Sequence, residues 1–86
     1  MSVFEYVPQG VCSRKIKLEL DGRQVKNVSF EGGCNGNLQG IGRLVEGMDI
    51  DEVIRRVTGI HCGMKQTSCP DQLSLALQAA RKELEK

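Results

Sequence analysis

Residues 14–31 read RKIKLELDGRQVKNVSFE. In the first half of this stretch, apolar residues alternate with charged ones. One face carries Ile16, Leu18 and Leu20, and the other carries Lys15, Lys17 and Glu19. Because strand side chains point alternately to opposite faces, this alternation predicts a half-buried strand over residues 14–20. Asp21-Gly22 is a strong hairpin-turn signal, so residues 24–31 are expected to return antiparallel to the first strand.

A shorter strand is expected over residues 3–7, and Pro8-Gln9-Gly10 ends it. After the hairpin, the apolar spacing changes to that of a helix. This helix is expected to present Leu38, Ile41, Leu44 and Val45 on its apolar face and to end at Gly47. Each of its three glycines, Gly36, Gly40 and Gly42, weakens a helix by about 1 kcal/mol relative to alanine. Such glycines suit a backbone that packs closely on a neighbour.

Two further helices are expected. The first begins at Asp49, where Asp49-Ile50-Asp51-Glu52 has the pattern of a capping box, and it ends at Gly59. Its apolar face consists of Ile50, Val53, Ile54 and Val57. Ser68 is the expected cap of the last helix, with Pro70 in its first turn. The buried stripe of this last helix is expected to consist of Leu73, Ala76, Leu77, Ala80 and Leu84.

Strands that precede helices indicate an α+β domain. We expect a small antiparallel sheet of two to three strands, followed by three helices packed on one face. With 86 residues, the chain is expected to form a single domain over residues 1–86. It has no Trp, one Tyr and two Phe, so its core lacks large aromatic anchors. A metal, disulfides or an oligomeric partner can offset such a deficit, and a homodimer is one expectation.

The charge and hydropathy patterns exclude several classes of protein. Twelve basic and eleven acidic residues give a net charge of +1, which does not indicate binding to nucleic acid. The N-terminal residues lack the basic and apolar regions of a signal peptide, and no stretch approaches the roughly 20 apolar residues that cross a membrane. We therefore expect a cytoplasmic protein, in a compartment where thiols stay reduced.

The chemistry of the chain is expected at its four cysteines, Cys12, Cys34, Cys62 and Cys69. In a reducing compartment, cysteines indicate metal binding or catalysis before they indicate disulfides. Cys34 precedes the first expected helix, and Cys69 lies in the first turn of the last one. Unpaired N–H groups and the dipole at a helix N-terminus favour a thiolate there. Cys12 begins a strand and Cys62 lies in a glycine-flanked loop, so we predict that all four converge on one site.

Four thiolates suit a tetrahedral zinc ion, and such a closed site leaves no position for a reacting water. We therefore expect a structural zinc held by Cys12, Cys34, Cys62 and Cys69, and no catalytic residue. Iron, alone or as an iron–sulfur cluster, has the same ligand preference. His61, the only histidine, can replace one cysteine, tune the site by a hydrogen bond to sulfur, or simply lie beside it. Two other interpretations are buried free cysteines and a framework of two disulfides.

Five consecutive residues, Thr67-Ser68-Cys69-Pro70-Asp71, spell the motif for which the TSCPD domain is named. The chain resembles the small stand-alone members of that family, over nearly its whole length and with all four cysteines in order. The other segments that carry the resemblance are Gly10-Val11-Cys12, Phe30-Glu31-Gly32-Gly33-Cys34-Asn35-Gly36-Asn37-Leu38 and Gly59-Ile60-His61-Cys62-Gly63.

Related domains lie at the C-terminus of cobalamin-dependent ribonucleotide reductases. The resemblance therefore implies an accessory role beside a protein partner, with a ribonucleotide reductase as one candidate and deoxynucleotide metabolism as the setting. A chain of 86 residues cannot by itself hold cobalamin, a nucleotide and a radical cysteine. We therefore do not expect reductase activity from this chain alone.

A second resemblance is to the U-type iron–sulfur cluster scaffolds and their zinc-bound sulfur-transfer relatives. The shared order is a cysteine, a strand hairpin, a phenylalanine–glycine–glycine–cysteine corner, a helix ending in glycine and a cysteine leading into the last helix. It matches Cys12, residues 14–31, Phe30-Glu31-Gly32-Gly33-Cys34, Leu44-Val45-Glu46-Gly47 and Cys69. The scaffolds' aspartate after the first cysteine is missing here, and one cysteine is additional. The resemblance implies a scaffold-like fold and, as an alternative function, sulfur transfer or cluster assembly with the cysteines as nucleophiles or cluster ligands.

Overall fold

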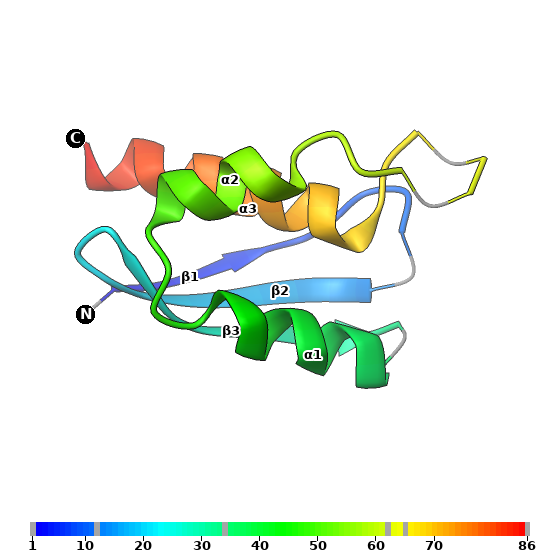
Figure 1. Cartoon of the computed structure of the whole chain (residues 1–86), viewed down its shortest axis with the longest axis horizontal. Coiled ribbons are helices and arrows are strands. Elements are labelled where there is room, and N and C mark those ends of the chain that lie inside the picture. The colour runs from blue at the N-terminus through cyan, green and yellow to red at the C-terminus, as the bar shows by residue number, and fades with distance from the viewer. Residues whose placement is uncertain (1, 12, 34, 62, 65, 86) are drawn as a thin grey trace.

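The computed structural model of the chain describes residues 2–11, 13–33, 35–61, 63–64 and 66–85. Within these residues, three strands come first and three helices follow (Figure 1). The elements are β1 (Ser2–Tyr6), β2 (Ser13–Asp21), β3 (Gln24–Gly32), α1 (Asn35–Val45), α2 (Ile50–Val57) and α3 (Cys69–Leu84). The α+β class and the order of elements predicted from the sequence are confirmed, and each strand end lies within one residue of its predicted position.

The three strands form one antiparallel sheet in the order β1-β2-β3. In the central strand, Leu18 lies opposite Phe4 of β1 and Val28 of β3. The predicted hairpin turn between β2 and β3 is confirmed. Gly22 in this turn has a φ of 60°, a left-handed conformation that glycine adopts without a steric penalty.

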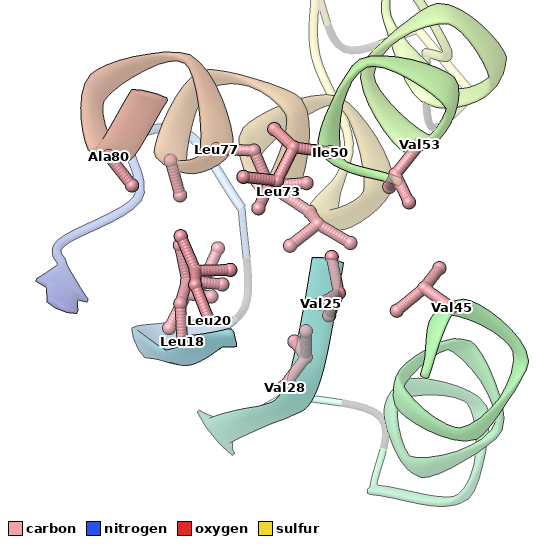
Figure 2. Close-up of a cluster of buried hydrophobic side chains, with 12 residues drawn as sticks. Leu18, Leu20, Val25, Val28, Val45, Ile50, Val53, Leu73, Leu77 and Ala80 are labelled. Atoms are coloured by element: carbon pink, nitrogen blue, oxygen red, sulfur yellow. The ribbon is translucent and has the colours of Figure 1, made fainter. Parts of the chain in front are cut away.

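The core lies between the inner face of the sheet and the helices (Figure 2). The strands contribute Ile16, Leu18, Leu20, Val25 and Val28, and the helices contribute Val45, Ile50, Val53, Leu73, Ala76, Leu77 and Ala80. Two residues expected on buried faces are instead exposed, Leu44 to 78% and Leu84 to 38%. Leu84 is the last residue of α3, and Leu44 lies about 100° around α1 from the buried Val45.

Helix α1 lies along β3, an edge strand of the sheet (Figure 1). The contact is closest at Gly42, where an added Cβ would lie 2.7 Å from the carbonyl oxygen of Val28. Nothing lies within 4 Å of a Cβ added at Gly36 or Gly40. The predicted close approach of the backbone is therefore confirmed for Gly42 and wrong for the other two glycines.

The linker between α1 and α2 also pairs with β3. The Val25 N–H donates to the Met48 carbonyl at 2.8 Å, and the Gly47 N–H donates to the Val25 carbonyl at 2.7 Å. Asp49 then caps α2, because its side chain accepts a hydrogen bond of 2.9 Å from the Asp51 N–H. These bonds satisfy backbone groups at the edge of the sheet and at the start of the helix.

The second half of the predicted capping box differs from expectation. The Glu52 carboxylate pairs with Arg55 at 2.6 Å and with Arg56 at 2.8 Å, one turn along the same helix. These hydrogen bonds, Arg55 first, lower the pKa of Glu52 to about 2. Because both arginines are exposed and Glu52 is only half-buried, such pairs add little to stability. Among the described residues, no helix has both the length and the apolar character that crossing a bilayer requires.

Replacing Gly42 with alanine is expected to destabilise the domain, because the new Cβ would press on the Val28 carbonyl oxygen. Overpacking of this kind costs about 1–3 kcal/mol. The matched control is Gly40→Ala in the same helix, which has open space and is expected to gain up to about 1 kcal/mol. Urea unfolding measures the free energy of unfolding of both variants. A Gly42→Ala variant as stable as Gly40→Ala would contradict the close packing of α1 on β3.

Candidate functional site

The five residues predicted for the site divide into two groups. Cys12, Cys34 and Cys62 lie outside the described residues, so their convergence with Cys69 stays a prediction. Cys69 and His61 are described. Within the described ranges, no group of three or more His, Cys, Asp or Glu side chains is placed to hold a metal ion.

Cys69 is the first residue of α3, which confirms its predicted place in the first turn of the last helix. Its side chain is half-buried, and its Sγ lies 3.4 Å from the Oγ of Ser13, within hydrogen-bond distance for sulfur. Ser13 is the first residue of β2, is only 3% exposed, and pairs with Gly32 at the end of β3. The start of β2, the end of β3 and the start of α3 therefore meet at one end of the domain (Figure 1).

Ser68 joins α3 to the segment that follows α2. Its Oγ accepts a hydrogen bond of 3.1 Å from the Asp71 N–H, which confirms the predicted helix cap. The same hydroxyl donates to the carbonyl oxygen of Ile60 at 2.6 Å. Ser68 is only 4% exposed, so its hydroxyl serves two backbone groups in a site largely shielded from water.

Asp71 makes a second connection to the same segment. One carboxylate oxygen accepts from the Thr67 hydroxyl at 2.5 Å, and the other accepts from the Gly59 N–H at 2.8 Å. These two hydrogen bonds, helped by the charge of the exposed His61, hold the pKa of the Asp71 carboxyl below its usual range. The contact of Asp71 with Gly59, twelve residues earlier in the chain, depends on the tertiary structure.

Gln72 ties a third segment to α3. It is buried, its side-chain oxygen accepts from the Gln9 N–H at 3.0 Å, and its side-chain nitrogen donates to the Thr67 hydroxyl at 2.9 Å. A Cβ added at Gly10 would lie 3.4 Å from a methyl carbon of Thr67, so this segment also runs close to the residues that lead into α3. Sequence reasoning missed Gln72 and Ser13. The sequence signal for Gln72 is that a polar residue stands four positions before Ala76, on the predicted buried face of the last helix.

The family model of the TSCPD domain matches residues 1–81 of the 86-residue chain. The chain belongs to the TSCPD domain family. In this TSCPD domain, the naming motif spans the cap and the first turn of α3, and it contacts the segment that follows α2. Neither the curated proteins nor the solved structures include a significant match to the chain. The similarity to iron–sulfur cluster scaffolds stays a prediction.

Replacing Gln72 with methionine keeps the size of the side chain but removes both of its hydrogen bonds. We expect a loss of about 1–3 kcal/mol, because two hydrogen bonds are lost and each contributes about 0.5–1.5 kcal/mol. The control is Gln66→Met at an exposed position, expected within about 0.5 kcal/mol of the wild type. Thermal unfolding compares the two variants, and equal effects would show that the Gln72 side chain ties no segment to α3.

Proposed function

We propose that this TSCPD domain binds one zinc ion through the thiolates of Cys12, Cys34, Cys62 and Cys69. Four thiolates fill the tetrahedral coordination that zinc prefers, so the ion would stabilise the domain and leave no open position for a reacting water. The role that follows is that of an accessory domain, whose metal maintains a surface for a partner. His61, next to Cys62 in the sequence, is the residue that could replace or support one of the four ligands.

One observation carries the proposal: chain segments that contain or adjoin cysteines meet at one end of the domain. Ser13 contacts Cys69 and pairs with Gly32, and Ser68 contacts Ile60. Each of these described residues is a cysteine or stands one or two positions from one. Two residues of extended chain span about 7 Å. Cysteines one or two positions from these contacts can therefore reach a common metal ion.

The surroundings of Cys69 support a bound thiolate. Its position at the N-terminus of α3 brings the positive end of the helix dipole close to the sulfur. The buried Ser13 hydroxyl can donate to Sγ, and hydrogen bonds from such outer residues orient and tune metal ligands. A helix N-terminus and a hydroxyl donor therefore lie beside a sulfur that we propose binds zinc.

Purified TSCPD domain is expected to contain one zinc per chain, measured by elemental analysis after anaerobic purification. Removing the zinc with a chelator should lower the melting temperature, because the energy of metal binding is then part of the folding energy. Cys62→Ser and Cys69→Ser should each melt at a lower temperature than the wild type, with no further effect of the chelator. Less than a tenth of an equivalent of metal, with four freely titratable thiols, would contradict the proposal. So would an unchanged melting temperature in Cys62→Ser.

The partner proposed from the family resemblance is a ribonucleotide reductase. Co-purification with the host's reductase, or a change in its rate on adding the zinc-loaded domain, would support this assignment. Absence of both effects would leave the zinc site standing and remove the reductase as its partner.

A second candidate function is sulfur transfer or cluster assembly, and the partial exposure of Cys69 favours it. A thiolate at a helix N-terminus that reagents can reach is suited to nucleophilic attack. A trapped persulfide on one cysteine, detected by mass spectrometry, would favour this function. So would iron and sulfide found in place of zinc. Inertness of all four thiols to mild alkylation in the metal-bound state would argue against it.

A further inference from the structure

The hydroxyls and carboxylate of the TSCPD motif connect the first turn of α3 to the segment after α2. Asp71 accepts from the Gly59 N–H at 2.8 Å, and Ser68 donates to the Ile60 carbonyl at 2.6 Å. The Thr67 hydroxyl donates to the other Asp71 oxygen at 2.5 Å and so orients the carboxylate. We call Thr67, Ser68 and Asp71 the clamp.

We propose that the clamp positions residues 59–60 beside Cys69, and that it thereby sets how slowly the domain releases a metal held by its cysteines. The second part of this inference rests on the proposed function. The three clamp residues are positioning residues, because their described hydrogen bonds are to backbone groups, to one another and to the side-chain amide of Gln72.

The segment after α2 is also attached at Thr58, whose hydroxyl lies 2.5 Å from the Ser74 hydroxyl of α3, and by a 3.5 Å bond from the Ile60 N–H to the Val57 carbonyl. Beyond Thr58, the clamp supplies its contacts to the start of α3. Gly59, Ile60, His61 and Met64 are all exposed, Met64 completely. Apolar burial therefore contributes little to holding this segment in place. The clamp is better shielded, since Ser68 is buried and Thr67 and Asp71 are half-buried.

The chemistry of the clamp suits a stable attachment. An ionised carboxylate that accepts a backbone N–H forms a charge-assisted hydrogen bond, roughly twice as strong as a neutral one. Ser68 adds a second bond one residue further along the segment, so two successive residues are held. A segment held in this way loses less conformational entropy when a neighbouring ligand binds metal.

The test compares zinc release from four variants of the full chain. Asp71→Ala removes the acceptor of the Gly59 N–H, and Thr67→Val removes the hydroxyl that orients Asp71 while keeping the shape of the side chain. Thr67→Ser keeps the hydroxyl and is the rescue variant. Asp49→Ala is the matched control, because Asp49 is also a carboxylate that accepts a backbone N–H at a helix start, at the far end of α2.

Zinc-loaded protein is mixed with an excess of a chromophoric chelator, and the release rate is followed by absorbance. We expect Asp71→Ala and Thr67→Val to release zinc about 10–100 times faster than the wild type, which is the range by which loss of an outer-shell partner weakens metal affinity. Thr67→Ser and Asp49→Ala should stay within roughly twofold of the wild type. Wild-type release rates in folded Thr67→Val would overturn the inference, as would equal acceleration in Asp49→Ala.

A second measurement separates the clamp from the zinc proposal. Hydrogen exchange at the Gly59 amide of the metal-free protein should be faster in Thr67→Val and Asp71→Ala than in Thr67→Ser. If the wild type binds no zinc, the proposed function and the release-rate part fail together, and Gly59 exchange alone decides the positioning part. Unchanged exchange in both clamp variants would overturn that part whether or not zinc binds. Thr67→Val and Thr67→Ser suffice for the test if Asp71→Ala does not fold.

Discussion

The apolar face of β2 has to be covered, and the rest of the structure follows from how α3 covers it. Leu18 and Leu20 are fully buried on the strand, and Leu73 and Leu77 are fully buried on the helix (Figure 2). Each such side chain contributes about 1.5–3 kcal/mol on burial. Since α3 begins at the same end of the domain where β2 begins, this packing brings Cys69 to within 3.4 Å of Ser13. The hydrophobic layer thus determines where the polar end of the domain forms.

The polar end is held by hydrogen bonds to backbone groups more than by charge. Gln9 and Gly59 are each bound through their main chain to a side chain of α3, and Ile60 is bound in the same way to Ser68, the cap of that helix. Main-chain groups in loops need partners, and the first turn of a helix offers side chains at regular positions to supply them. The family motif therefore has a structural explanation around its cysteine. Its serine and aspartate bind the neighbouring segment, and its threonine orients the aspartate.

Most of the fold could be predicted from periodicity and local signals. The alternation of residues 14–20 and the turn at Asp21-Gly22 determine the hairpin, and Ser68 determines where α3 begins. These features depend on contacts between near neighbours in the chain, which the sequence shows directly. The prediction that Leu44 is buried is wrong, because helical spacing does not say which side of a helix faces the sheet.

For the candidate site, the sequence alone determined the place of Cys69 at a helix start, and it predicts the thiol chemistry. Only the tertiary structure decided that Ser13 lies against Cys69 and that Asp71 binds Gly59. These pairs are 56 and 12 residues apart, and no local propensity relates such positions. They meet because the burial of apolar surface drives the packing of α3 on β2. That packing acts on the whole molecule and leaves no pattern in either segment alone.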